Sequence, residues 1–99
     1  ARWPDLILVA PATANIISST ANGLATDLAQ TLLMATTKQI VFAPSMNVRM
    51  WENELFQKNI DILKSNGFKF IGPTEGEMAC GEYGMGRMME PQQIFQSLI

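Results

Sequence analysis

Three short segments of the sequence combine proline, small residues and hydrogen-bonding side chains in a pattern that suits ligand binding. They are residues 11–15 (Pro-Ala-Thr-Ala-Asn), residues 44–47 (Pro-Ser-Met-Asn) and the longer stretch 72–90, which contains the single cysteine, Cys80. The amide of Asn47 can donate two hydrogen bonds to a carboxylate without presenting a full positive charge. A thiol in a glycine-rich segment can approach a ligand, although a lone cysteine is ordinarily an inert small apolar residue. These segments are therefore the candidates for chemistry.

The elements that must position these segments are predicted from apolar runs. Residues 5–10, 39–43 and 68–72 are short apolar runs, and the first two are nearly continuous, which is typical of strands buried on both faces of a parallel sheet. Residues 14–36 predict two helical stretches hinged near Asn22-Gly23. Residues 52–66 predict one helix. Its apolar stripe is formed by Leu55, Phe56, Ile60 and Leu63. The predicted order is β-α-β-α-β, followed by a long loop and a short helix from Pro91.

Each apolar run ends in a small residue followed by proline, at Ala10-Pro11, Ala43-Pro44 and Gly72-Pro73. Parallel strands place all three exits at one edge of the sheet, and ligands of open α/β sheets bind at this carboxyl edge. The alternative is that each proline merely ends its strand. The repetition of the pattern favours a ligand site at this edge.

The segment 72–90 holds five of the seven glycines and four of the seven methionines, without periodicity. Long irregular segments are usually lids, binding loops or disordered, and methionine-rich segments favour packing on a surface. We therefore expect a glycine-hinged lid over a ligand.

The composition limits the class of protein. The 99 residues correspond to one domain, and 47% are hydrophobic while only 16% are charged, which favours a folded chain with part of its surface covered. A net charge of −2 argues against a nucleic-acid partner. The uncharged span 6–26 is too polar for a membrane helix. One cysteine and no secretory signal predict a cytoplasmic protein, and the lack of histidine argues against a metal site.

Three blocks carry a resemblance to a known family. Residues 11–15 (PATAN), 43–51 (APSMNVRMW) and 79–88 (ACGEYGMGRM) resemble three motifs of the flavin-dependent cysteine decarboxylases, in the same order. The resemblance implies a flavodoxin-like (Rossmann-like), doubly wound parallel sheet in three α/β/α layers that binds FMN at its carboxyl edge. It also implies a homo-oligomer, a trimer or a dodecamer, with FMN at the subunit interface.

The resemblance further implies that residues 1–99 are the carboxyl-terminal part of a decarboxylase domain, with 72–90 as its substrate clamp. An N-terminal strand, a phosphate-binding loop and an active-site histidine are then expected on upstream chain.

The resemblance assigns roles to individual residues. Asn47 would hold the substrate carboxylate, and Cys80 would donate a proton in the final reduction. Cofactor contacts are expected from Pro11, Thr13, Ala14 and Asn15. Substrate contacts are expected from Met46, Asn47, Met50, Ala79, Cys80, Gly81 and Arg87.

Each of these roles has a simpler structural alternative. Thr13, Asn15 and Asn47 suit helix N-caps, and Arg87 suits an ordinary surface arginine. Asp27 is the only charge between residues 6 and 37, and the sequence leaves open whether it is paired, caps a helix or lies at an interface.

The function implied by the resemblance is FMN-dependent decarboxylation of the small molecule 4'-phosphopantothenoylcysteine to 4'-phosphopantetheine, for coenzyme A. The alternatives are a peptidyl-cysteine decarboxylase of the lantibiotic type, which stops at an enethiol, and a non-catalytic regulatory relative that binds a protein partner. Cys80 favours the coenzyme A reaction. Whether a further synthetase domain follows is open.

Overall fold

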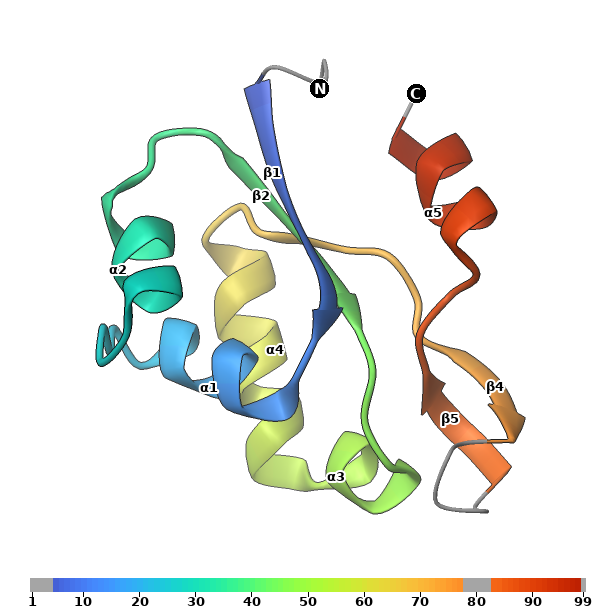
Figure 1. The fold of residues 1–99 in the computed structure, drawn as a ribbon. Coiled ribbons are helices and arrows are strands. Elements are labelled where there is room, and N and C mark those ends of the chain that lie inside the picture. The colour runs from blue at the N-terminus through green and yellow to red at the C-terminus, as the bar shows by residue number, and fades with distance from the viewer. Residues whose placement is uncertain (1–4, 78–82, 99) are drawn as a thin grey trace.

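The computed structural model describes residues 5–77 and 83–98, and its centre is a parallel three-stranded sheet (Figure 1). The strands β1 (Leu6–Ala12), β2 (Gln39–Pro44) and β3 (Lys69–Phe70) are ordered β1-β2-β3. The pairing brings Leu8 opposite Val41 and Phe42 opposite Phe70. The three predicted strands and their parallel arrangement are therefore confirmed.

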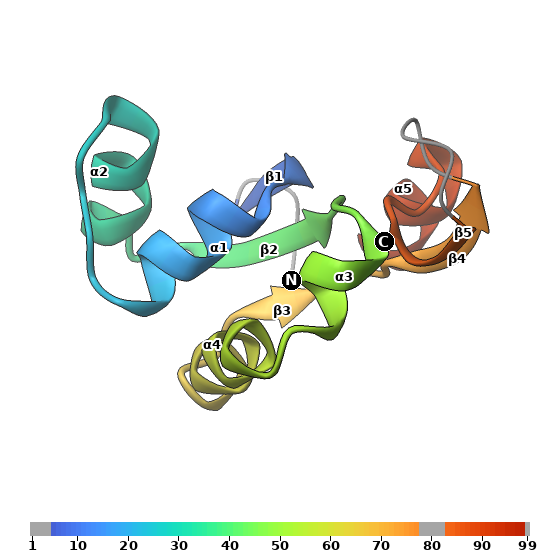
Figure 2. The ribbon, with the colours of Figure 1, turned by 90° about the horizontal axis from the view of Figure 1, so that it is seen from below.

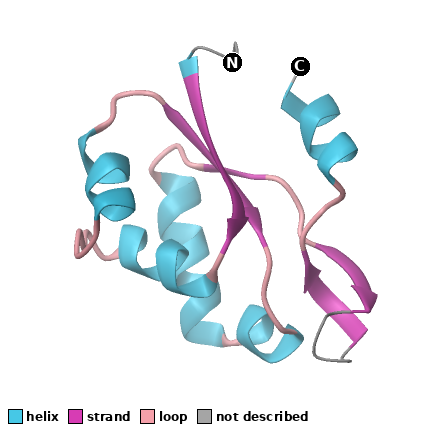
Figure 3. Ribbon diagram, in the orientation of Figure 1, coloured by secondary structure: helices cyan, strands magenta, loops and turns pink. Residues whose placement is uncertain are grey.

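Helices lie on both sides of this sheet, as Figures 1 and 3 show. On one side are α1 (Ala14–Ala21), α2 (Leu28–Ala35) and α4 (Glu54–Ser65), and a short helix α3 (Val48–Glu52) precedes α4. On the other side is α5 (Pro91–Leu98). The predicted α/β architecture is thus confirmed. The order β1-β2-β3 runs one way across the sheet, and the reversal of strand order that defines double winding does not occur among the described strands.

The core lies between the sheet and the helices α1 and α4. Phe42 of β2 is fully buried, and its ring stacks on Phe68 at a centroid distance of 5.9 Å. Ile17 of α1 and Ile60 and Leu63 of α4 belong to the same buried cluster. This packing fixes the ends of β1 and β2 relative to α1, and therefore the edge of the sheet where the predicted site lies.

Capping explains where the helices begin. The carboxylate of Asp27 accepts a hydrogen bond from the Gln30 N–H at 2.8 Å and so caps α2, which answers the question that the sequence left open. Asn53 caps α4 in the same way, through the Phe56 N–H at 3.0 Å.

Three expectations about the elements were wrong. β1 is half-buried with Ala10 and Pro11 exposed, because no described strand pairs with its outer edge, so only β2 is a strand buried along most of its length. Leu55 is 70% exposed and does not belong to the buried stripe of α4, because it lies in the first turn on the outer face.

The third correction concerns the segment 72–90, which is not an irregular loop. Its residues form an antiparallel hairpin of β4 (Thr74–Glu77) and β5 (Tyr83–Arg87). The abundance of glycine hid the pattern of side chains that would have predicted strands. Figure 2 shows this hairpin beside α3, at the far end from α2. A lid function of the hairpin stays a prediction.

Candidate functional site

Backbone hydrogen bonds join the exits of β1 and β2. The Ser45 N–H donates to the Ala12 carbonyl oxygen at 3.0 Å, just past the point where both strands end. This contact holds the segment 11–15 against the segment 44–47 at one edge of the sheet, as the order of the strands predicted.

The third candidate segment meets the same edge through β5. The Met46 N–H donates to the Gly86 carbonyl oxygen at 2.8 Å, and α3 and β5 lie in contact. The structure therefore brings parts of all three candidate segments together, although they are far apart in sequence.

The start of α1 carries the residues that were predicted to contact the cofactor. The Thr13 hydroxyl accepts a hydrogen bond from the Ile16 N–H at 3.3 Å and caps the helix, which leaves its own O–H as a donor. Pro11 is exposed and Ala14 is buried. Asn15 is exposed, and its amide bonds to none of the described residues. This helix start thus offers neutral donors at the carboxyl edge.

Asn47 combines the two roles that the sequence suggested for it. Its Oδ1 accepts a hydrogen bond from the Met50 N–H at 2.9 Å and caps α3. Its Nδ2 makes no hydrogen bond within the described part of the chain, and the residue is half-buried. Because the cap uses only the oxygen, the two N–H groups are left to donate to a carboxylate. Capping and substrate binding are therefore compatible.

The two methionines of this segment differ in position. The side chain of Met46 packs in the hydrophobic core, so this residue presents mainly its backbone at the edge. Met50 is 46% exposed and lines an open hollow of about 490 Å³ between α1 and the helices α3 and α4. Ala14 lines the same hollow, so a predicted cofactor contact and a predicted substrate contact face one space.

Sequence reasoning missed Arg49 and Gly86. Arg49 is exposed, lines the hollow beside Met50 and bonds to none of the described residues. Gly86 has a φ of +130°, and a Cβ at this position would clash with the Met46 carbonyl oxygen. The Gly-x-Gly spacing at 84–86 was the signal that could have pointed to such a close approach.

Arg87 ends β5 and forms an ion pair with Glu90 at 2.9 Å. About half of its side chain is exposed, so the pair adds little stability. Its predicted contact with substrate stays a prediction. Ala79, Cys80 and Gly81 lie between β4 and β5 in the sequence, outside the described residues.

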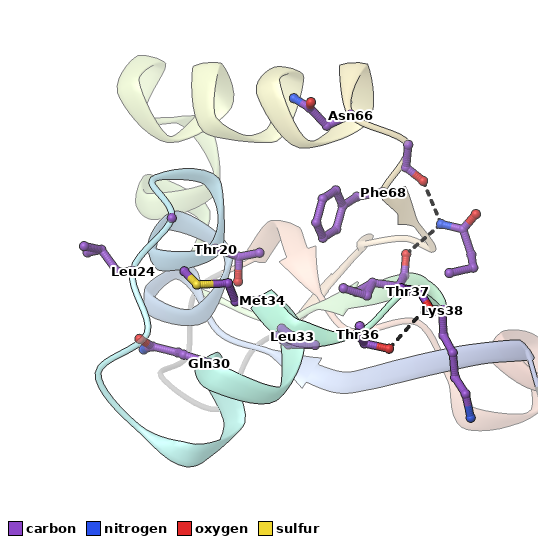
Figure 4. Close-up of a pocket in the computed structure, with 14 residues that line it drawn as sticks. Thr20, Leu24, Gln30, Leu33, Met34, Thr36, Thr37, Lys38, Asn66 and Phe68 are labelled. Carbon is purple, nitrogen blue, oxygen red and sulfur yellow. Dashed lines mark hydrogen bonds between the residues drawn. The ribbon is translucent and has the colours of Figure 1, made fainter.

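A second hollow, of about 450 Å³, lies at the opposite edge of the sheet, where β2 and β3 begin (Figure 4). Thr20, Gln30, Met34 and Phe68 line it, and Lys38 is its one charged residue. None of the predicted site residues lies there, and its side chains do not form a catalytic set.

Among residues 5–77 and 83–98, no group of three or more carboxylate, cysteine or histidine side chains could hold a metal ion. Within the same residues, no helix is long and apolar enough to cross a bilayer.

Comparison with known proteins places the chain in a family. The sequence profile of the Flavoprotein family matches residues 1–99. The chain belongs to the Flavoprotein family. This membership agrees with the resemblance to flavin-dependent cysteine decarboxylases that the three motifs carry.

Individual members of the family are similar in sequence and fold. The coenzyme A biosynthesis bifunctional protein CoaBC of Bacillus subtilis is 49% identical over 94 residues, which cover 95% of this chain and 23% of CoaBC. A PPC decarboxylase mutant complexed with pantothenoylaminoethenethiol superposes with a TM-score of 0.91 at 34% identity, over 98% of this chain and 54% of that chain. The FMN-binding protein AtHal3 superposes with a TM-score of 0.83 at 35% identity, over 98% of this chain and 54% of the AtHal3 chain.

These similarities confirm the flavodoxin-like fold and agree with the resemblance to the flavin-dependent cysteine decarboxylases. The chain spans about a quarter of the CoaBC protein and about half of the two solved chains.

Proposed function

We propose that this chain forms part of an enzyme that uses FMN to decarboxylate 4'-phosphopantothenoylcysteine to 4'-phosphopantetheine. The observation that carries this proposal is the Nδ2 of Asn47, which has no partner among residues 5–77 and 83–98 and lies at the sheet edge where the exits of β1 and β2 meet β5. The similarity to the coenzyme A biosynthesis protein CoaBC over 95% of the chain, and to a PPC decarboxylase over 98% of it, supports this reaction.

The start of α1 fits one side of a flavin. The edge of a flavin ring carries neutral carbonyl and N–H groups, which match the neutral donors of Thr13 and Asn15. Backbone N–H groups of the first helical turn add further donors. We therefore assign cofactor contacts to Pro11, Thr13, Ala14 and Asn15. When bound, FMN supplies reversible two-electron oxidation of the substrate thiol, which creates the electron sink that loss of CO₂ requires.

The chain's own residues orient the substrate and move one proton. The two N–H groups of Asn47 hold the carboxylate next to the start of α1, and a neutral donor avoids over-stabilising the charged ground state. Met50, Ala79, Gly81, Arg87 and the backbone of Met46 complete the substrate contacts. The Cys80 thiol donates the proton that completes the last reduction. The hairpin β4–β5 covers the edge and excludes water.

The test of this function uses the full-length parent protein. We expect the purified protein to be yellow and to convert 4'-phosphopantothenoylcysteine to CO₂ and 4'-phosphopantetheine, measured by mass spectrometry. A colourless protein would support the non-catalytic regulatory alternative. Turnover of a cysteine-ending peptide to an enethiol, without turnover of the phosphopantothenoyl substrate, would support the peptide-modifying alternative.

The cofactor contact has its own test. Asn15→Ala should lower the fraction of protein that retains FMN, while the unfolding free energy of the apoprotein stays unchanged, because the Asn15 amide bonds to no described residue. Asn66→Ala is the matched control, since Asn66 lies at the opposite edge, where its amide caps α4 through the Ile62 carbonyl oxygen at 2.7 Å. Equal retention of FMN in both variants would contradict the assignment.

We also propose that the protein is a cytoplasmic homo-oligomer, a trimer or a dodecamer, with FMN at the subunit interface. The homo-oligomer is supported by apolar surface on and beside α2, and FMN at the subunit interface follows from the family resemblance alone. The exposed fractions are 51% for Leu24, 85% for Leu28 and 56% for both Leu32 and Met34. Leu28→Glu should shift the full-length protein to smaller species in mass photometry, whereas an unchanged mass would exclude this face as the interface.

A further inference from the structure

The strand β5 lies on the Met46–Asn47 backbone more closely than any side chain would permit. Gly86 has a φ of +130°, and a Cβ on it would clash with the Met46 carbonyl oxygen and lie 3.4 Å from the Asn47 carbonyl carbon. Its own carbonyl oxygen accepts the Met46 N–H at 2.8 Å. Gly86 is therefore both the point of closest approach and a hydrogen-bond partner.

Two other glycines with positive φ, Gly23 and Gly67, do not share this environment. Gly23 has a φ of +68° and Gly67 a φ of +90°, and a Cβ at either position would meet nothing within 4 Å. Both need glycine for the backbone conformation alone. Gly86 needs it also for the contact with the turn that carries Asn47.

We propose that Gly86 is a positioning residue of the active site, which sets the distance between the Asn47 amide and the hairpin β4–β5. This inference rests on the proposed function. The cap of α3 fixes the Asn47 side chain relative to its own turn, and Gly86 fixes β5 relative to the same turn. Any side chain at position 86 forces the two backbones apart and separates the group that holds the carboxylate from the hairpin.

The contact is also favoured energetically, because Met46 is buried. A buried N–H without a partner is costly, and the Gly86 carbonyl oxygen is the partner of this one. The position of β5 against the Met46–Asn47 backbone is thus defined by a hydrogen bond as well as by the absence of a Cβ on Gly86.

The test compares Gly86→Ala with Gly67→Ala in the full-length, flavin-bound protein. Both variants place alanine at a positive φ, but only the first meets the Met46 backbone. A displacement of about 1 Å can cost on the order of 10²-fold in rate, so we expect Gly86→Ala to lower kcat by about that factor. It should also raise the fraction of product released in the oxidised enethiol form, because Cys80 lies just before β5 in the sequence.

The product fraction separates positioning from stability. A purely structural role would lower the amount of folded enzyme in both variants without changing the ratio of oxidised to reduced product. If Gly86→Ala keeps the wild-type kcat and the wild-type product ratio, the inference is overturned.

Amide hydrogen exchange keeps the inference testable if Gly86→Ala does not fold or if the proposed function fails. In the wild-type protein the Met46 amide should exchange as slowly as the amides of β2, because it donates to Gly86. Exchange as fast as in an exposed loop would overturn the inference. Wild-type protein that binds flavin but forms no decarboxylated product would instead refute the proposed function. The Met46 exchange rate would then show by itself whether β5 is held on the Met46 backbone.

Discussion

Substitution of Asn47 separates the two roles of its side chain, because the cap uses Oδ1 and substrate binding uses Nδ2. Asn47→Asp keeps an oxygen for the Met50 N–H, and aspartate caps helices as well as asparagine does, so the unfolding free energy should change by no more than a few tenths of a kcal/mol. Asn47→Ala loses the cap and should destabilise the protein by about 1 kcal/mol.

The expected activities rank the other way, with Asn47→Ala more active than Asn47→Asp. Asn47→Ala removes two hydrogen bonds to a charged group, each worth roughly 1.5–3 kcal/mol, and should lower kcat/KM by about 10²- to 10⁴-fold. Asn47→Asp removes the same donors and also sets a negative charge against the substrate carboxylate. At about 4 Å and an effective dielectric constant near 20, this repulsion costs about 4 kcal/mol, or about 10³-fold in rate, so the total loss should reach about 10⁵-fold or more.

Urea unfolding and a mass-spectrometric product assay measure the two quantities on the same full-length protein. Asp27→Asn is the matched control, because it exchanges carboxylate and amide at the cap of α2, where Oδ1 accepts the Gln30 N–H at 2.8 Å. It should leave both quantities unchanged. If Asn47→Asp keeps more activity than Asn47→Ala, activity follows the cap alone and Asn47 does not bind the carboxylate.

Two further predictions concern the last reduction and the core. Cys80→Ser should still release CO₂ but accumulate a product that lacks two hydrogens, because a hydroxyl is a far poorer proton donor than a thiol of pKa about 8.5. Mass spectrometry of the product measures this. Normal product formed at an undiminished rate would contradict the role of Cys80. Ile60→Ala should destabilise the protein by about 2–5 kcal/mol in urea unfolding, since Ile60 is 1% exposed in the core. The control is Ile62→Ala in the same helix, at a side chain that is 45% exposed, and it should cost about 0.5 kcal/mol or less. Equal losses would show that the core is not built as described.

Local patterns were enough to predict the parallel sheet and the candidate edge. The apolar runs that became β1, β2 and β3 are short and are separated by helical stretches, and this order permits few topologies. The residues after each proline were predicted to share an edge, and the hydrogen bond from Ser45 to Ala12 joins two of these exits. The family followed from three sequence motifs, because they keep their order along the chain.

Only the tertiary structure decided features that depend on contacts between distant residues. The glycine-rich pattern of residues 72–90 predicts no regular element, and the hairpin exists because β4 and β5 pair with each other and β5 packs on the turn before α3. The sequence also left the role of Asn47 open between cap and ligand, since the residue type suits both. The Met50 N–H occupies Oδ1 and leaves Nδ2 without a partner among the described residues, and this division of one side chain between two roles is a matter of three-dimensional geometry.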